Sequence, residues 1–494
     1  MIRKVIILVF AVLSALQASA QTISLDSCRI MALRNNKQMR VSLINRDLTL
    51  NLRKAARTAY LPKVDVVGSY QHFGKEFSAM DRAQKNSLNN LGTNMLSGGI
   101  GKVTDSITSL TQQGVFTPAM AQQIGSLLQN YSGNIVAPFN SLGQDIVDAF
   151  RTDTKNVWTG AVVVRQPVYM GGAIVAANKM ADIGEQFAEN QQEFTRQTTL
   201  YDIDRAYWMV VSLKQKEKLA YSYRDLVKKL DDDVKKMINQ GVATKSDGLK
   251  VDVAVNSADL KITQVEDGVV LAKMLLCQLT GLPLESKITL ADENKEHLDD
   301  TYYQDMDTQT ALDNRPEVRM LQNAVDISKQ NTNLVRAQFL PHVLLTGGYL
   351  FSNPNPFNGI DREFGSTWNV GVTLQMNVWN WFEGAYKTRA TKAATLMAEL
   401  ERDDLKQKMQ LEVEQDRFKL KEARKRLVMA ENNLKSANEN LRSANVGFKE
   451  GVMNSTDVMN AQTAWQQAQS AKIDAEVDVK LSQSALSKAL GILN

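Results

Sequence analysis

The chain carries one pattern of landmarks twice, and this duplication restricts the fold more than any other feature. Residues 32–70 match residues 311–349 at a constant offset of 279, with 11 identities in 39 positions and no gap. A second set, at an offset of 210, pairs Trp158 with Trp368, Val168 with Val378, Gly241 with Gly451, Asp247 with Asp457 and Gly281 with Gly491. Because both sets recur in the same order, two large copies of one unit are predicted.

Each copy is predicted to hold a helix, a strand, a loop, a strand, a very long helix, a tight turn and a helix. In the first copy these fall at 26–60, 63–73, 74–156, 157–168, 170–239, 240–245 and 246–280. In the second copy the first helix, 306–339, ends before Leu340-Pro341, because proline cannot continue a helix. The predicted boundaries are a leader at 1–20, a first repeat at 21–281, a linker or equatorial segment at 282–305 and a second repeat at 306–494.

The first 20 residues have the pattern of a secretory signal peptide. Arg3 and Lys4 precede an apolar run at 5–16, and Ala18-Ser19-Ala20 provides a cleavage site before Gln21. The run is too short to span a bilayer, and no later stretch approaches about 18 uninterrupted apolar residues. The exported chain is therefore expected to be periplasmic, secreted or a β-barrel protein.

Charge and chemistry exclude several classes. The net charge is +4, and +2 without the two leader cations, so nucleic-acid binding has no electrostatic support. Cys28 and Cys277 allow one disulfide in an oxidising compartment but do not require it. Neither cysteine lies in a metal or nucleophile motif, and the histidines have no nearby metal-ligand partners: His72, His297 and His342. No enzyme activity, metal or cofactor is predicted.

Four segments alternate apolar and polar residues with the period of a β-strand. Their apolar faces keep one phase: Val64, Val66, Gly68 and Tyr70; Trp158, Gly160, Val162 and Val164; Val343, Leu345, Gly347, Tyr349 and Phe351; Trp368, Val370, Val372 and Leu374. Their length of about 9 to 12 residues suits tilted membrane strands.

Aromatic residues bracket these strands. One set lies beside the loops, at Tyr70, Trp158, Tyr349 and Trp368, and the other at the opposite ends, at Tyr169, Trp379, Trp381 and Phe382. Two interfacial girdles in contact with outer-membrane lipid are the favoured interpretation. The edge of a soluble β-sandwich is the alternative.

The number of strands predicts the number of chains. Four strands cannot close a barrel, and lipid does not tolerate open edges, so several chains must contribute. Two chains would give eight strands with a filled interior, whereas three give twelve strands and begin to leave a conduit. A homotrimer is predicted.

A seam that steps by three and four residues predicts a coiled coil: Leu420, Ala423, Leu427, Ala430, Leu434, Ala437, Leu441, Ala444 and Phe448. The fold class is therefore mainly α with a membrane β part: a trimeric 12-stranded barrel and a periplasmic α-barrel of long helices. An autonomous coiled-coil scaffold is the alternative, but it leaves the strands unexplained.

The chain resembles TolC-type outer-membrane efflux proteins over essentially its whole mature length. The resemblance is carried by Ser24-Leu25-Asp26-Ser27-Cys28 leading to Ala32-Leu33-Arg34-Asn35-Asn36, the Leu-Pro pairs at 61–62 and 340–341, Arg165-Gln166-Pro167-Val168 with Gly171-Gly172, and the turns Gly241-Val242 to Asp247 and Gly451-Val452 to Asp457-Val458. It implies a trimeric outer-membrane channel with a periplasmic tunnel, which exports small molecules such as drugs, or secreted polypeptides.

The resemblance also implies partners. A periplasmic adaptor (membrane fusion) protein would connect the channel to an inner-membrane pump. The positions expected to touch the adaptor are Gly241, Val242, Gly451 and Val452.

The resemblance further places a constriction near the second hairpin, where an aspartate ring narrows the tunnel. The matching positions are Asp457 and Asn460, so a lower ring charge is expected, although Asp457 equally suits a helix N-terminus. Some members lock the closed tip through Tyr and Arg partners of the first hairpin's Asp. Here Asp247 lacks them, because Phe448 and Met453 stand at those places.

Residues 74–156 form an insertion, for which packed helices are predicted from Leu91, Met95, Ile100, Phe116, Ile124, Leu127, Phe139, Ile146 and Phe150. It either covers the mouth of the channel or is a variable surface decoration. The alternative function for the chain is a periplasmic coiled-coil adaptor or scaffold without channel activity.

Overall fold

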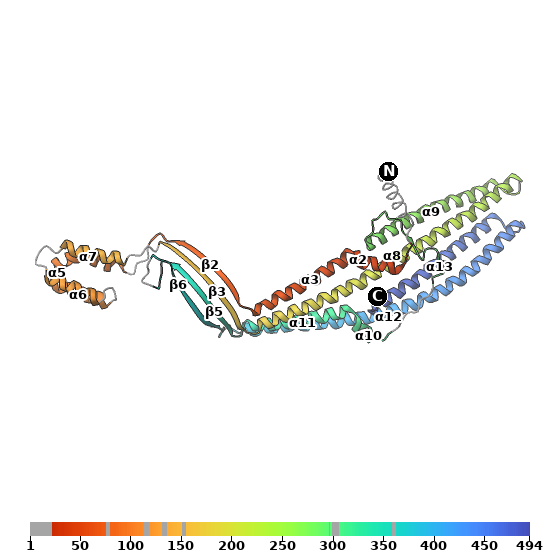
Figure 1. Cartoon of the computed structure of the whole chain (residues 1–494). Coiled ribbons are helices and arrows are strands. Elements are labelled where there is room, and N and C mark those ends of the chain that lie inside the picture. Colours follow the sequence, from red (N-terminus) through yellow and green to blue (C-terminus); the bar gives the residue numbers. More distant parts are fainter. Residues whose placement is uncertain are drawn as a thin grey trace, which may run out of the picture. The chain divides into compact units, whose positions relative to one another are not determined.

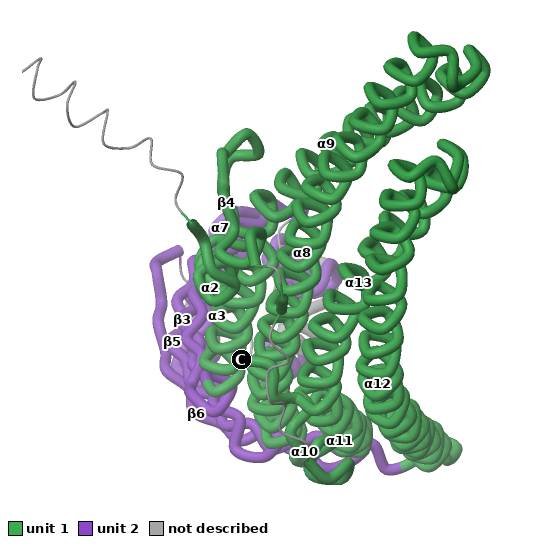
Figure 2. Tube along the Cα trace, turned by 90° about the vertical axis from the view of Figure 1, so that its right-hand side faces the viewer, with its two compact units in different colours: residues 1–57, 172–338, 379–494 green, residues 58–171, 339–378 purple. Residues whose placement is uncertain are grey.

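The computed structural model of the chain describes residues 22–75, 80–112, 118–130, 136–150, 155–295, 297–298, 306–357 and 362–494. The predicted signal peptide at 1–20, the end of the predicted linker and Phe116 lie outside these ranges, and the side chains of Ile100 and Leu127 are not described. The chain divides into two compact units (Figure 2): unit 1 comprises Met1–Arg57, Gly172–Gln338 and Trp379–Asn494, and unit 2 comprises Thr58–Gly171 and Phe339–Val378.

Unit 2 contains a four-stranded antiparallel sheet in the order β2-β3-β5-β6 (Figure 1). Its strands are β2 (Lys63–His72), β3 (Asn156–Met170), β5 (His342–Asn353) and β6 (Gly365–Gln375), and β2 is preceded by a 3-10 turn, η1 (Thr58–Tyr60). All four predicted strands are present. The predicted end of the second strand at 168 is wrong, because β3 continues to Met170 through a bulge between Pro167 and Tyr169.

The strand register confirms the predicted apolar face. Val66 lies opposite Val162, Val162 opposite Tyr349, and Tyr349 opposite Trp368, so one row crosses all four strands. Since side chains alternate between faces, the other predicted apolar positions share this face. The bulge in β3 also places Tyr169 opposite Val343, so Tyr169 joins the apolar face in place of its neighbour.

The insertion is helical, as predicted: α4 (Arg82–Asn89), α5 (Leu91–Gln112), α6 (Pro118–Asn130) and α7 (Val136–Ala149). Leu91, Met95, Ile124, Phe139 and Ile146 are buried in one cluster, whereas Phe150 is exposed. The side chain of Asn140 on α7 accepts hydrogen bonds from the backbone N–H groups of Gly92 and Thr93 at 2.8 and 3.3 Å. These contacts give the insertion its own packed core.

Unit 1 consists mainly of helices, which are α2 (Leu25–Asn35), α3 (Lys37–Arg57), α8 (Ala173–Asn239), α9 (Lys245–Thr280), α10 (Thr308–Asn314), α11 (Pro316–Ala337), α12 (Glu383–Lys449) and α13 (Ser455–Ala489). A short parallel pair, β1 (Thr22–Ile23) with β4 (Thr289–Leu290), was not predicted. Among the described helices, none combines the length and the hydropathy needed to cross a membrane.

The predicted single helices at 26–60 and 306–339 are wrong, because each is broken once. At the first break the side chain of Asn36 accepts a hydrogen bond from the backbone N–H of Gln38 at 2.8 Å, which starts a new helix. At the second break Pro316 occupies the first turn of α11, where its missing N–H costs nothing.

The helices of unit 1 pack in a continuous order. Along one part the order is α3, α8, α11, α12, and along the other it is α9, α8, α13, α12. Figure 2 shows α8 with α9 and α12 with α13 as two hairpins. The predicted seam on α12 is buried at Leu420, Ala423, Ala437, Leu441 and Ala444. Each order leaves two edge helices.

Candidate functional sites at the hairpin turns and the open edges

The two hairpin turns are built in the same way. Gly241 and Gly451 have φ values of 79° and 75°, which glycine adopts without strain. At the first turn the N–H of Val242 donates to the carbonyl of Met237 at 3.0 Å. At the second turn the N–H of Val452 donates to the carbonyl of Gly447 at 2.8 Å. The N–H of Gly241 also donates to the carbonyl of Ile238, and that of Gly451 to the carbonyl of Phe448, so each long helix ends in a Schellman motif.

A capping box begins the helix after each turn. The side chain of Thr244 accepts from the N–H of Asp247, and the Asp247 carboxylate accepts from the N–H of Thr244 at 3.2 Å. Asn454 and Asp457 repeat this exchange, with the Asp457 carboxylate 3.1 Å from the N–H of Asn454. Both aspartates therefore stabilise a helix start, which is one of the two roles considered for Asp457.

The electrostatics of Asp247 follow from these contacts. Hydrogen bonds from the Thr244 side chain and backbone lower the pKa of Asp247, and the nearby Lys250, 3.4 Å away, lowers it further. Asp247 has these local partners in place of the Tyr and Arg that the resemblance would supply. Phe448 is partly buried against an apolar cluster that includes Val227 and Val458.

The turns present apolar side chains to solvent. Val242 is 66% exposed and Val452 is 79% exposed. Asp457 in the first turn of α13 and Asn460, about one turn further on, are exposed as well. The structure therefore makes all four predicted tip positions accessible to a partner.

The predicted aromatic positions are exposed in the single chain. The rings of Tyr70 and Trp158 contact each other at a tilt of 40°, with centroids 4.4 Å apart, and the hydroxyl of Tyr349 lies 2.6 Å from that of Ser366. Trp379 and Trp381 contact each other edge to face, with centroids 5.7 Å apart.

The edge helices carry exposed apolar stripes. On α3 the stripe contains Val41, Ile44, Leu48 and Leu52. On α12 it contains Met397, Leu400, Leu411 and Phe418, and the first buried side chain of this helix is Val413. Residues 383–412 of α12 therefore have no buried side chain within one copy of the chain.

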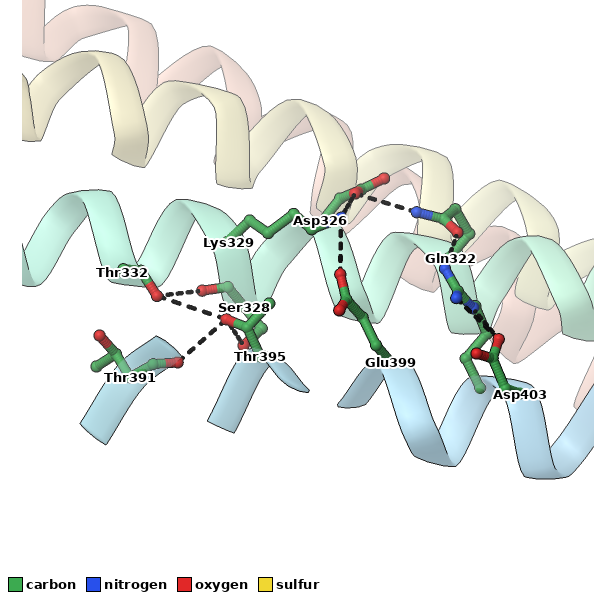
Figure 3. A network of polar contacts seen from close by, with 10 residues as sticks. Gln322, Asp326, Ser328, Lys329, Thr332, Thr391, Thr395, Glu399 and Asp403 are labelled. Carbon is green, nitrogen blue, oxygen red and sulfur yellow. Dashed lines mark hydrogen bonds and ion pairs between the residues drawn. The ribbon is translucent and has the colours of Figure 1, made fainter. Parts of the chain in front are cut away.

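The contact between α11 and α12 is largely polar where Figure 3 shows it. The hydroxyls of Ser328 and Thr395 are 2.9 Å apart, and Lys329 lies 3.2 Å from Glu399. Arg402 donates to the side chain of Gln322 at 3.0 Å. This seam joins the helices without covering the apolar stripe of α12.

A buried ion pair was not predicted. Arg29 on α2 donates two hydrogen bonds to Asp204 on α8, at 2.8 and 2.6 Å, and Ser484 on α13 donates a third at 2.6 Å. Asp204 has no exposed surface. The sequence carries no signal for this contact, because Arg29 and Ser484 lie 175 and 280 positions from Asp204 and none of the three belongs to a motif.

Cys28 and Cys277 are free, buried thiols in one apolar cluster. Burial raises the pKa of Cys28 to about 12, with a smaller contribution from Cys277. Burial also raises the pKa of Cys277, so both thiols stay protonated near neutral pH.

Three comparisons with known proteins agree. The sequence profile of the outer membrane efflux protein family matches residues 308–492. Outer membrane efflux protein BepC of Brucella suis is 24% identical over 414 residues, which cover 78% of this chain and 88% of that protein. The outer-membrane channel OprN has a similar fold, with a TM-score of 0.71, 15% identity and coverage of 94% and 89%. The CmeC outer-membrane channel of Campylobacter jejuni also has a similar fold. Its TM-score is 0.71 and its identity 14%, and the match covers 95% of this chain and 86% of that channel.

The chain consists of a four-stranded sheet and two long helical hairpins, and these outer-membrane channels have a similar fold. By sequence profile, by sequence and by fold, the chain is similar to outer membrane efflux proteins, which confirms the TolC-type resemblance found in its sequence. It is located in the outer membrane and has a large periplasmic portion.

Proposed function

We propose that three copies of the chain form an exit duct, with a 12-stranded barrel in the outer membrane and a periplasmic tunnel of helices. Docked to a periplasmic adaptor and an inner-membrane pump, the duct exports small molecules such as drugs, or secreted polypeptides. It is proposed to conduct rather than catalyse. The observation that carries the proposal is that the sheet and both helix orders end in edges that have no partner among the described residues.

The helix layers support ring closure. Both orders end at α12, and their other ends are α3 and α9. The apolar stripes on α12 and α3 face no partner within the described chain. Helix α9 carries a third exposed apolar stripe, which contains Leu249, Val253, Leu260, Leu271 and Leu275. Two different edges that meet head to tail generate a ring. In this arrangement α12 of one copy packs against α3 and α9 of the next.

The sheet supports the same closure. Its edges are β2 and β6, and adjacent strands are antiparallel. Because four is an even number, β6 of one copy runs antiparallel to β2 of the next, so the pattern continues across the junction. Three copies then remove every edge from the lipid and leave a conduit.

The internal repeat and its boundaries remain part of the proposal. In its support, α8 and α12 both have 67 residues, and α9 and α13 have 36 and 35. Gly281 and Gly491 end the short helices with φ values of 77° and 72°, and they abut Asn35 and Asn314 at the two helix breaks.

Adaptor docking is proposed at Gly241, Val242, Gly451 and Val452, and a constriction at Asp457 and Asn460, with Asp247 and Phe448 behind it. Val242 and Val452 are exposed on turns whose backbone is fixed by Schellman motifs and capping boxes, so they form a rigid apolar surface. With one carboxylate per chain at Asp457 and an amide at Asn460, the ring of a trimer would hold three carboxylates. A periplasmic adaptor without a channel would leave the four-stranded sheet without a role.

Charge on the turns tests the docking. Val242→Asp and Val452→Asp should abolish or strongly reduce drug export and adaptor cross-linking, because a carboxylate in an apolar contact loses hydration without a partner. Trimers should remain, since both side chains are exposed. The matched controls, Val242→Thr and Val452→Thr, keep the shape and should keep export. Normal export by both aspartate variants together would contradict docking at these turns.

A further inference from the structure

The short helices pack on the long helices in the same register in both halves of the chain. Arg53 on α3 pairs with Glu185 on α8 at 2.5 Å. The positions 279 and 210 residues later are Thr332 on α11 and Thr395 on α12, whose hydroxyls lie 3.5 Å apart (Figure 3). A second contact recurs at the same offsets: Arg29 with Asp204, and Thr308 with Glu414. The register is thus kept although the residues differ.

This correspondence gives each contact between the helices a counterpart. The order α3, α8, α11, α12 contains three contacts, of which the first and the last correspond to each other. The middle contact, between α8 and α11, corresponds to a contact between α12 and α3. Those two helices lie at opposite ends of the order, so a second copy that continues the order would supply the missing α3.

The middle contact is made by amides. Asn190 on α8 donates a hydrogen bond to the side-chain oxygen of Asn323 on α11 at 2.9 Å. Asn323 in turn donates to the side-chain oxygen of Gln186 on α8 at 3.3 Å. Because Asn323 is buried, it needs both of these partners. The amides therefore fix how α11 lies along α8.

The counterparts of these three amides are all apolar. They are Leu396 and Leu400 on α12, 210 positions after the two residues of α8, and Ile44 on α3, 279 positions before Asn323. In one copy the three side chains are 57%, 62% and 65% exposed. The open edges therefore carry a matching apolar set at the positions where the closed contact carries hydrogen-bonded amides.

A glutamine present in both halves is buried once and exposed once. The side chain of Gln197 on α8 donates to the carbonyl of Gly491 at 3.2 Å, and Gln197 is buried. Its counterpart on α12, Gln407, is exposed, and so is Gly281, the counterpart of Gly491. A cavity of about 490 Å³ lies beside Gly281. The register that brings Ile44 to Leu400 would also bring Gln407 to the Gly281 carbonyl of the second copy.

We propose that α12 of one copy packs on α3 of the next in the register of α8 on α11, with Leu396 and Leu400 enclosing Ile44 of the second copy. The proposal rests on the proposed function, because it needs a second copy at this edge. An exchange of α3 and α11 between the two contacts would bury Asn323 against leucines and leave its amide without partners. The difference in chemistry thus directs each short helix to its own long helix during assembly.

Cysteine cross-linking of trimers in detergent tests the register. Ile44→Cys/Leu400→Cys should join chains to one another when a short bifunctional thiol reagent is added. The matched control Leu52→Cys/Leu400→Cys should not, because Leu52 lies on the same exposed stripe but two helical turns, about 12 Å, further on. The wild type, whose two cysteines are buried, gives the background.

Trimers in which the Ile44 pair stays uncrosslinked, or in which the Leu52 pair reacts instead, overturn the register. Conductance by those trimers would show that the proposed function still holds. A chain that forms no trimers in detergent would overturn the proposed function and the register together.

Rebuilding the amides at the open edge tests the directing role. Ile44→Asn places an amide between leucines and should lower the temperature at which trimers dissociate, and Leu396→Gln/Leu400→Asn should do the same. The triple variant copies the residues of α8 and α11 and should recover most of the loss. All three positions are exposed in one copy, so each chain should fold. Wild-type stability of Ile44→Asn trimers, or a triple variant no more stable than Ile44→Asn, overturns the proposal.

Discussion

At the scale of single residues, the carboxylates near the tips have an observed local role. Asp247 and Asp457 each accept a hydrogen bond from the N-cap residue of their own helix. The motif could be predicted as a helix start, because Thr244 and Asn454 stand three positions earlier. How these side chains would face the proposed tunnel depends on the neighbouring copies and could not be predicted from one sequence.

Removing the cap residue should loosen the turn. Thr244→Ala deletes the side chain that accepts the Asp247 N–H and should cost about 1 kcal/mol. Hydrogen exchange over residues 240–250 should then be roughly fivefold faster. Asn454→Ala should do the same in the second turn, whereas Ser246→Ala, an exposed neighbour, is the control. Equal exchange in Thr244→Ala and the wild type would show that the box does not hold the turn.

The cap should also depend on pH. The pKa of Asp247 is lowered by hydrogen bonds from Thr244 and by Lys250. A lowered pKa stabilises the turn at pH values above the ordinary aspartate value of about 3.9, and this contribution is lost as the pH falls through the lowered pKa. The difference between wild type and Thr244→Ala, corrected for intrinsic exchange rates, should therefore shrink at acidic pH. A difference that grows on acidification would be inconsistent with this sign.

At the scale of elements, the sequence predicted the strands and long helices but not the breaks in the short ones. The strands carry an alternation that one register satisfies, and the long helices are bounded by glycines and capping residues. The breaks at Asn36 and Arg315 are enforced by tertiary contacts, because the ends of α9 and α13 occupy the space beside them. The apolar period continues through each break, so periodicity alone predicts one helix.

Glycine substitutions separate backbone strain from contact. Gly241→Ala should cost about 1–2 kcal/mol, because its φ is positive but nothing lies within 4 Å of an added Cβ. Gly281→Ala should cost more, because the same strain is joined by a Cβ only 2.6 Å from that of Asn35. Melting followed by circular dichroism in detergent should give the larger loss for Gly281→Ala. A larger loss for Gly241→Ala than for Gly281→Ala would show that Gly281 does not pack against Asn35 at the helix junction.

The buried pair that joins α2, α8 and α13 should behave as a unit. Arg29→Met leaves the buried Asp204 carboxylate without its cation and should cost about 3–5 kcal/mol. Arg29→Met/Asp204→Leu should recover much of that loss. Arg442→Met removes a solvent-exposed pair with Glu439 and should lower the melting temperature far less than Arg29→Met. A double variant no better than Arg29→Met in the same melting assay would argue against the pairing.

At the scale of the whole molecule, the open edges organise the account. The sheet ends at β2 and β6, and the helix orders end at α3, α9 and α12, with apolar stripes on each edge helix. The proposed head-to-tail ring would pair every one of these edges. The exported substrate has no signature in these edges, because a conduit takes its selectivity largely from the pump that loads it.

The most direct test of the central claim is the conductance of the purified protein in a planar bilayer. If three copies close a barrel and a tunnel, protein that runs as a heat-modifiable trimer in detergent should insert and give current steps of one size. Trimers that insert into the bilayer and pass no current would contradict the account.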